Sequence, residues 1–226
     1  MQSFWRTTKK IAIGLVAFQF AYILLLKWVD PPFTMTQLGS LFGGYGLKRD
    51  YVGLEKMSPN ARLAVMASED QLFPDHSGFD FKSIQKAMEY NKRKPGRVRG
   101  ASTISQQVAK NVFLWQGRSW IRKGLEVYFT FMIETVWGKK RILETYLNVA
   151  EMGKGVFGIE AAARHHFGKS ASALTRQEAA MIAATLPNPK AYTIKPISRA
   201  VSARYPWILR QMQNLDEDPD VAALLK

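Results

Sequence analysis

The sequence predicts a mainly α-helical protein in which one globular domain follows a single membrane-spanning helix. A long apolar run near the N-terminus predicts the membrane helix, and helix-capping residues followed by apolar residues at helical spacing recur through the rest of the chain. Neither the alternation typical of strands nor an internal repeat stands out. With 226 residues and 47% hydrophobic content, the chain can bury one sizeable core, so we expect one main domain.

The N-terminal segment has the pattern of an uncleaved membrane anchor. Residues 1–10 carry basic side chains and no acidic one, and residues 11–26 are apolar except for Gln19. As a helix this run spans ~24 Å, just enough for a bilayer core. A cleaved signal peptide is the alternative, but the run is long for one and no small-residue cleavage pattern follows. We expect residues 1–10 in the cytoplasm, a membrane helix at 11–29 and the remaining chain outside.

The globular domain is expected at residues 58–226, after a connector at residues 30–57 that contains two prolines and several glycines. Ser58 and Pro59 are a typical N-cap and first residue of a helix that carries Glu69 near its end. Apolar residues predicted to face the core from this helix are Ala61, Val65 and Met66. The next apolar stripe consists of Phe81, Ile84 and Met88.

Five further helices follow from caps and apolar spacing. The first two are a helix from Ser102 or Thr103 through Val112, and a helix from Trp120 to Val136 with Leu125, Phe129, Met132 and Val136 on its inner side. The others are a helix with Ile142, Tyr146 and Val149 inside, a helix at residues 159–167, and a helix opened by the capping box Thr175–Glu178 that runs to Leu186. A last helix is expected near residues 200–212, followed by an acidic, frayed tail at residues 216–220.

Charge and cysteine content narrow the classes of partner. Lys and Arg total 32 against 18 acidic residues, a formal charge of +14, which favours a polyanionic partner such as nucleic acid, anionic lipid or a pyrophosphate-bearing substrate. The predicted export of the domain argues against nucleic acid. The absence of cysteine excludes disulfides and thiolate metal sites.

A run of basic residues at positions 92–99 interrupts the helices before Gly100. Pro95 and Gly96 in this run, together with Gly100, predict a mobile loop. Such a charge run is ordinarily a solvated connector, but each Lys or Arg near a membrane surface adds about 1 kcal/mol of attraction to anionic groups. We therefore expect this loop to contact substrate diphosphate and anionic lipid.

The densest polar stretch is EDQLFPDHSGFD at residues 69–80. A carboxylate at a helix end can act as a general base if it is partly buried and held within hydrogen-bond reach, and Glu69 is placed to do so. The alternative is a solvated acidic turn whose side chains cap backbone groups, which we favour for Asp75 and Asp80. His76 is interpreted as a structural hydrogen-bonding residue.

Two further stretches carry candidate cations. In GASTISQQVAKN, at residues 100–111, Gln107 and Lys110 share one helical face, so Lys110 is positioned to meet a phosphate. Arg122 and Lys123 then precede Glu126 on the long helix. By spacing alone, an ordinary i,i+4 salt bridge from Arg122 to Glu126 is the simpler interpretation.

Together these stretches resemble the peptidoglycan glycosyltransferases of family 51, specifically the monofunctional biosynthetic members. The motif EDxxFxxHxGxD matches residues 69–80, GxSTIxQQxxKN matches 100–111, and RKxxE matches 122–126. A fourth motif, KxxILExYLN followed by spaced glycines and GIxxAA, matches residues 139–148 and then 153–162. One departure is Thr130, where the family often has Ala, and we expect it to concern packing.

The resemblance implies a lysozyme-like helical domain on the periplasmic side of the bacterial inner membrane, working with cell-wall synthesis or division proteins. It would polymerise lipid II into linear glycan strands by inverting β-1,4 transfer from undecaprenyl-pyrophosphate-linked glycan. Glu69 would be the base and Glu126 a second catalytic carboxylate that orients the cations or holds a divalent ion, Mg or Mn. The remaining implied site residues bind substrate: Phe73, Ser102, Gln106, Gln107, Lys110, Asn111, Arg118, Arg122 and Lys123.

Two other functions remain open at this point. A hydrolase acting on finished glycan could use Glu69 and Glu126, but it needs no diphosphate site. A non-catalytic membrane protein with a basic surface would not depend on Glu69 at all.

Overall fold

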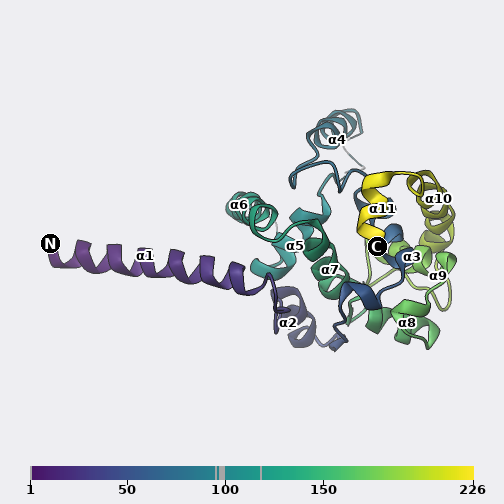
Figure 1. The fold of residues 1–226 in the computed structure, drawn as a ribbon, viewed down its shortest axis with the longest axis horizontal. Coiled ribbons are helices and arrows are strands. Elements are labelled where there is room, and N and C mark those ends of the chain that lie inside the picture. The colour runs from purple at the N-terminus through teal and green to yellow at the C-terminus, as the bar shows by residue number, and fades with distance from the viewer. Residues whose placement is uncertain (1, 95, 97–99, 118) are drawn as a thin grey trace.

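The structure, a computed structural model, describes residues 2–94, 96, 100–117 and 119–226. These residues are mainly helical, as the sequence predicts, and one long helix projects from a body built of the others (Figure 1). The α-helices are α1 (Gln2–Leu25), α2 (Met35–Phe42), α3 (Pro59–Glu69), α4 (Phe81–Arg93), α5 (Ile104–Phe113), α6 (Trp120–Val136), α7 (Lys139–Val149), α8 (Ile159–Phe167), α9 (Arg176–Thr185), α10 (Arg199–Leu215) and α11 (Pro219–Leu225). Short 3₁₀ helices occupy Leu54–Lys56 and Ala171–Ala173.

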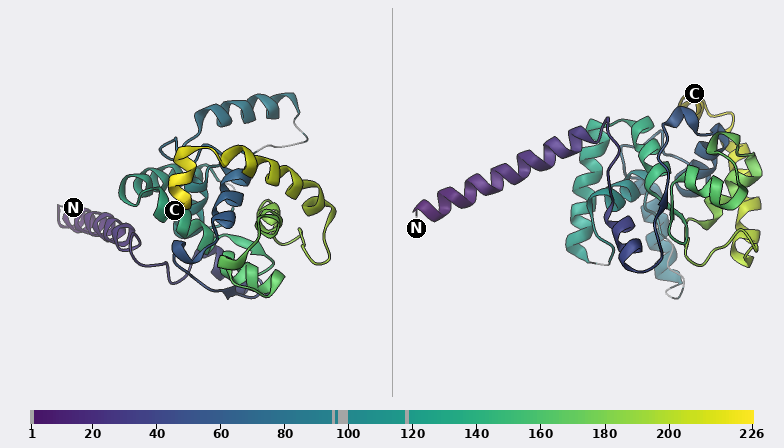
Figure 2. Two further views of the ribbon diagram at one scale, coloured as in Figure 1. Left: turned by 45° about the vertical axis from the view of Figure 1, so that its right-hand side comes forward. Right: turned by 90° about the horizontal axis from the view of Figure 1, so that it is seen from below.

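Helix α1 is long and apolar enough to cross a membrane. Its segment Phe4–Leu25 has a mean hydropathy of 1.5. Both views in Figure 2 show it extending away from the body, which it meets near α5 and α6 in Figure 1. The helix begins earlier than the expected segment 11–29. It also ends earlier, at Leu25, because residues 26–28 form a turn. These features are consistent with a single-pass anchor.

The C-terminal end of α1 packs into the body. Ile23 and Leu26 are buried in the hydrophobic core. Trp137 Nε1 donates a hydrogen bond of 2.8 Å to the Ile23 carbonyl oxygen, and Gln19 Nε2 donates one of 2.9 Å to the Tyr128 hydroxyl. The anchor is therefore attached both to α6 and to Trp137, the residue that follows α6.

Arg141 on α7 closes this end of the anchor. Its Nε and Nη2 donate to the Leu26 carbonyl oxygen at 3.0 and 2.9 Å, and Nη2 also donates to the Val29 carbonyl oxygen at 2.9 Å. Its Nη1 donates to the carboxylates of Asp30, at 2.9 Å, and Glu144. The last carbonyl groups of a helix lack intrahelical donors, and a cation there is also favoured by the helix dipole. Arg141 thus supplies hydrogen-bond donors to the backbone carbonyl groups where the anchor ends.

Replacing Arg141 with methionine should destabilise the detergent-solubilised protein. The change removes the donors to two carbonyl oxygens and leaves Asp30 and Glu144 without their shared cation. A loss of about 2–4 kcal/mol is expected, which lowers the melting temperature, Tm, by about 5–10 °C for a chain of this size. The exposed neighbour Lys140 supplies the matched control, Lys140→Met. If the two variants had the same Tm, Arg141 would not hold the anchor.

The segment expected to be a connector, residues 30–57, contains helix α2. Thr34 Oγ1 accepts a hydrogen bond of 3.2 Å from the Gln37 amide, and Gln37 Oε1 accepts one of 3.2 Å from the Thr34 amide. This capping box satisfies two N–H groups that the first turn leaves free. The pattern Thr34-x-x-Gln37 is a sequence signal for the helix, and the neighbouring glycines obscure it.

Three short strands, which the sequence does not predict, form a sheet beside the helices. They are β1 (Lys48–Arg49), β2 (Glu151–Gly153) and β3 (Val156–Phe157), in the order β1-β3-β2 with β1 parallel and β2 antiparallel to β3. Strands this short cannot show an alternating pattern. Gly155 joins β2 to β3 with φ of +68°, and a Cβ there would lie 2.1 Å from the Tyr45 carbonyl oxygen. Only glycine permits this close approach of the connector to the body.

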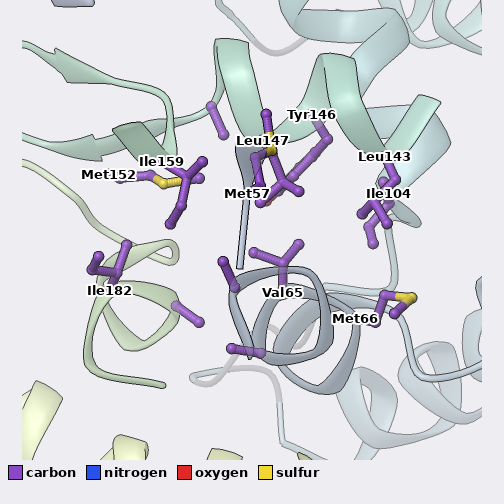
Figure 3. Packing of buried hydrophobic residues seen from close by; sticks show 14 of the residues in the cluster. Met57, Val65, Met66, Ile104, Leu143, Tyr146, Leu147, Met152, Ile159 and Ile182 are labelled. Carbon is purple, nitrogen blue, oxygen red and sulfur yellow. The ribbon is translucent and has the colours of Figure 1, made fainter. Parts of the chain in front are cut away.

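The core is built mainly from α3, α5, α7, α8 and α9, whose apolar side chains meet in Figure 3. Ser58 Oγ caps α3 by accepting a hydrogen bond of 3.1 Å from the Asn60 amide. The residues predicted to face inward from α3 and α7 are buried: Ala61, Val65, Met66, Ile142, Tyr146 and Val149. These predictions are confirmed.

The apolar stripe predicted for α4 does not face the core. Phe81 and Met88 are 74% and 57% exposed, and Ala87 is the buried residue of the helix. In Figures 1 and 2, α4 lies at the edge of the body, apart from the core helices. The prediction was wrong because helical spacing reveals an apolar face but not what covers it.

Helix α6 has the predicted bounds, but its inner side differs from the prediction. Glu126, Thr130 and Ile133 are buried, whereas Leu125 is 36% exposed. Phe129, Met132 and Val136 are partly buried and pack against the core. The helix is apolar around most of its circumference, so spacing alone misplaces the inner face.

The acidic C-terminal tail is folded rather than frayed, with a turn at residues 216–217 and a short helix after it. Helix α11 begins after Asp218, whose Oδ1 accepts hydrogen bonds from the Asp220 and Val221 amides at 2.9 and 3.2 Å. Val221 is fully buried, and the Arg62 guanidinium donates to the last carbonyl oxygens of the helix. Asp218 followed by Pro219 is an N-cap and first-residue pattern that predicts this helix.

Candidate active site

Glu69 is the last residue of α3 and lies against α5. Its side chain is 15% exposed. Gln107 Nε2 donates a hydrogen bond of 3.0 Å to Oε2, and Ser68 Oγ donates one of 2.9 Å to Oε1. The two oxygens are thus oriented by different donors, and each keeps a lone pair for another proton. This geometry suits a carboxylate that accepts a proton from a substrate hydroxyl.

Tyr146 fixes the amide of Gln107. Its hydroxyl donates a hydrogen bond of 3.3 Å to Gln107 Oε1, so the Gln107 NH₂ group points toward Glu69. Burial raises the pKa of Tyr146 well above its ordinary value, and the nearby charges of Glu69 and Asp70 raise it further. The hydroxyl therefore stays protonated and remains a donor.

Asp70 joins the turn after α3 to the start of α5. Asp70 Oδ2 accepts a hydrogen bond of 2.9 Å from the Ile104 amide, and Oδ1 lies 2.9 Å from His76 Nε2. His76 Nδ1 accepts from the Gly78 amide at 3.1 Å, which leaves Nε2 to carry the proton donated to Asp70. The structural role predicted for His76 is confirmed.

The turn at Gly78 needs glycine and also explains Thr130. Gly78 has φ of +89°, and a Cβ there would lie 2.7 Å from Thr130 Cγ2. Thr103 Oγ1 donates a hydrogen bond of 2.7 Å to the Gly78 carbonyl oxygen. The expectation that Thr130 concerns packing is confirmed. Asp80 caps α4 as predicted, by accepting a hydrogen bond of 2.9 Å from the Ser83 amide.

Glu126 lies inside a cationic cluster that we define as Lys110, Arg122 and Lys123. The Glu126 side chain is 3% exposed, and Arg122 Nη1 lies 2.6 Å from its Oε2. Lys123 Nζ donates to Oε1. The i,i+4 pair predicted from spacing is present, and a second cation occupies the other oxygen. A buried carboxylate that is paired with two cations is not available as a base, and the three side chains together carry a preorganised net positive charge.

Lys110 interacts electrostatically with both carboxylates, Glu126 and Glu69. Burial lowers its pKa, Glu126 opposes this shift, and the cations Arg122 and Lys123 add to it. Glu69 also interacts with Lys110 and raises its pKa. A partly buried ammonium group in such surroundings binds an incoming anion more strongly than an exposed one.

Two residues predicted to contact substrate, Phe73 and Gln106, are buried and have structural contacts. Phe73 is fully buried in the core, with Lys139 Nζ 4.5 Å from its ring centroid. Gln106 is 3% exposed, and its Oε1 accepts a hydrogen bond of 3.1 Å from the Thr103 amide. Gln106 thus completes the capping box of α5. Motif matching cannot separate residues that build a site from residues that touch a ligand.

Of the other predicted contacts, Ser102 is exposed just before α5, and Asn111 is 8% exposed near its end. Asn111 Oδ1 accepts a hydrogen bond of 3.4 Å from Thr36 Oγ1 on α2. Gln116 Nε2 in turn donates a hydrogen bond to Thr36 Oγ1. Helix α2 therefore borders this end of the site. Sequence reasoning missed Thr36, and no sequence signal pointed to it.

Part of the predicted cationic surface cannot be placed. Arg118 lies outside the residues that the structure describes, as do Arg97 and Arg99 of the expected basic loop. Lys92 and Arg93 belong to the last turn of α4, and Lys94 ends the helix. The helix therefore extends further into the basic run than the sequence predicts.

Comparison with known proteins shows to which family the chain is similar. The model of the Transglycosylase family matches residues 35–213. The chain is 51% identical over 222 residues to a biosynthetic peptidoglycan transglycosylase from Yersinia pseudotuberculosis serotype O:3 (strain YPIII), covering 95% of this chain and 92% of that protein. It is also 51% identical over 218 residues to the biosynthetic peptidoglycan transglycosylase of Yersinia pestis (strain Pestoides F), covering 93% of this chain and 90% of that protein.

Proposed function

The chain belongs to the transglycosylase family and is a peptidoglycan transglycosylase of cell-wall synthesis, and from this premise we propose that it polymerises lipid II with release of undecaprenyl pyrophosphate. One observation carries the proposal. Glu69 accepts hydrogen bonds at the end of α3 as a base would, and a separate carboxylate, the buried Glu126, is paired with Arg122 and Lys123 of the cationic cluster. A base on one side and positive charge on the other are what displacement of a diphosphate requires.

In the proposed step, Glu69 removes the proton from the 4-hydroxyl of the acceptor sugar. That oxygen attacks the anomeric carbon of the lipid-linked donor and forms the new β-1,4 bond, with inversion. The bond from the anomeric carbon to the pyrophosphate oxygen breaks, and the leaving diphosphate keeps the electron pair. Lys110, Arg122 and Lys123 stabilise the negative charge that develops there.

The proposal includes no protein-bound metal. Arg122 Nη1 and Lys123 Nζ already occupy the two oxygens of Glu126. No group of three ligating side chains occurs among the residues for which the structure gives positions. We propose that any requirement for Mg or Mn belongs to the diphosphate oxygens of the substrate.

The outer face of α6 supports a site at the surface of the bacterial inner membrane. Large apolar side chains on this face are exposed: Trp120 (93%), Ile121 (76%), Phe131 (61%), Val127 (45%), Tyr128 (40%) and Leu125 (36%). The face adjoins the anchor, since Gln19 of α1 donates to Tyr128. A surface of this kind fits the lipid interface, with the domain on the periplasmic side. The cations of α6 then lie on its inner side, at the depth of a lipid-linked diphosphate.

Replacing both Ile121 and Phe131 with lysine should weaken this membrane contact while the anchor keeps the protein in the bilayer. Each change removes the burial of a large apolar side chain, about 1.5–3 kcal/mol, and adds a charge. In a background in which the other five tryptophans are replaced by phenylalanine, we expect quenching of Trp120 fluorescence by bromine-labelled lipid to fall by at least about half in proteoliposomes. The same changes at Phe81 and Met88 on α4 provide the matched control. Equal quenching in the variant and the wild type would place α6 away from the lipid.

A hydrolase that cuts finished glycan is the competing function. It would have no use for buried cations beside Glu126, because its leaving group carries no diphosphate. Two assays of the full chain separate the functions: polymerisation of lipid II in proteoliposomes, and release of soluble fragments from purified sacculi. Synthesis without release supports the proposal, whereas release without synthesis would replace it with hydrolysis.

A further inference from the structure

Arg204 of α10 lies beside Glu69, although 135 residues separate them in the sequence. Its Nη2 is 3.5 Å from Glu69 Oε1, and the two side chains are 33% and 15% exposed. The same nitrogen donates to the Ser68 carbonyl oxygen at 3.3 Å and to Ser68 Oγ at 3.2 Å. Ser68 Oγ in turn donates to the same Glu69 oxygen. Arg204 therefore contacts the carboxylate both directly and through Ser68.

The location of Glu69 makes such a cation necessary. The C-terminal end of a helix carries partial negative charge and carbonyl groups without donors, so a carboxylate is disfavoured there. Glu69 is the last residue of α3 and is followed by the buried carboxylate of Asp70. The Arg204 guanidinium offsets both effects, since it donates to a carbonyl oxygen of the last turn and lies within ion-pair distance of Glu69.

The remaining contacts of Arg204 hold it in one orientation. Its carbon Cζ lies 5.7 Å from the centroid of the Trp207 ring, one turn further along α10. Helix α10 packs against α3 and α9. Among the residues that the structure describes, the buried Arg204 Nε has no acceptor. The polar contacts of the guanidinium group therefore come from Nη2, which contacts Glu69 and Ser68.

We propose that Arg204 is a positioning residue that holds the Glu69 carboxylate, together with Ser68, in the orientation needed for proton transfer. This inference rests on the proposed role of Glu69 as the base. Gln107 orients one oxygen from α5, and Arg204 with Ser68 orients the other from the opposite side. Arg204 is thus expected to act on the chemical step and not on substrate binding.

The test is steady-state polymerisation of lipid II by the full-length chain in detergent. Arg204→Ala should lower kcat by about tenfold to a hundredfold, the effect of losing a hydrogen bond to a charged group, while KM stays within about twofold. Arg204→Lys keeps a cation and should retain more activity than Arg204→Ala. The exposed Arg210 on the same helix supplies the control, Arg210→Ala, which should leave both constants unchanged.

Chemical rescue separates positioning from a general loss of structure. Guanidinium or methylguanidinium, added to Arg204→Ala below denaturing concentrations, should restore part of kcat, because either cation can occupy the vacated position. This readout decides the question even if Arg204→Ala has a lower Tm. Absence of rescue overturns the proposal, as does a raised KM with unchanged kcat, which would indicate a substrate contact.

Failure of this inference is distinguishable from failure of the proposed function. If Glu69→Gln is inactive but Arg204→Ala matches the wild type, Glu69 remains the base and only the role of Arg204 is lost. If Glu69→Gln keeps wild-type activity, the assignment of the base fails and the proposal for Arg204 fails with it.

Discussion

Replacing Glu69 with glutamine is expected to abolish glycan polymerisation. Glutamine keeps the shape of the side chain, but its one carbonyl oxygen replaces only one of the two carboxylate oxygens that accept from Gln107 and Ser68. Its amide group also cannot take up the proton of the acceptor hydroxyl. General base catalysis contributes about 10²–10⁴-fold, so kcat should fall by at least about a hundredfold. Incorporation of labelled lipid II into glycan strands measures the effect directly.

Two controls separate chemistry from folding in this variant. The Tm of Glu69→Gln should remain close to that of the wild type, since the substitution loses the ion-pair contact with Arg204 but also removes an unfavourable charge from the helix terminus. Glu89→Gln changes an exposed carboxylate on α4 and should leave polymerisation unaffected. Activity of Glu69→Gln within a few-fold of the Glu89→Gln control would exclude Glu69 as the base.

Sequence reasoning succeeded where the structural signal is local. The bounds of α6 and α8 match the predicted ranges, and the capping box of α9 forms between Thr175 and Glu178 as predicted. A cap involves residues only three positions apart, so a reader of the sequence sees the complete interaction. The same local logic correctly gave Ser58 as the cap of α3.

The errors concern features that depend on residues far apart in the chain. The apolar stripe of α4 is visible in the sequence, but its exposure follows from the absence of a neighbouring core helix at that edge of the described body. The strand β1 exists because Lys48 and Arg49 pair with residues 156 and 157. Neither the exposure of α4 nor the pairing of β1 can be inferred from residue spacing, because both depend on tertiary contacts.

The site shows the same division. The motifs brought Glu69, Gln107 and the cationic cluster into one interpretation, and the structure places Gln107 within hydrogen-bond distance of Glu69. The motifs could not separate Phe73 and Gln106, which build the site, from residues that face a substrate. Arg204 was not among the predicted site residues, since its contact with Glu69 arises from the packing of α10 on α3.

The second large effect is expected at Lys110. Replacing it with glutamine removes a buried positive charge from the place where the diphosphate leaves, and the loss of one such stabilising group lowers the rate by about 10²–10³-fold. Both kcat and kcat/KM for lipid II should fall, because the charge on the leaving oxygen develops in the transition state. The exposed Lys140 gives the matched control, Lys140→Gln, with no expected change.

Lys110 should also set the alkaline limit of activity, which distinguishes it from a structural lysine. Burial lowers its pKa from the ordinary value of 10.5, so the ammonium loses its proton at a lower pH than an exposed lysine does. Activity that depends on the charged form is present below that pKa and declines as the pH rises through it. Arginine stays charged throughout this range, so Lys110→Arg should retain part of the activity and lose the alkaline decline. An alkaline limb that is identical in wild type and Lys110→Arg would assign the decline to another group and contradict this prediction.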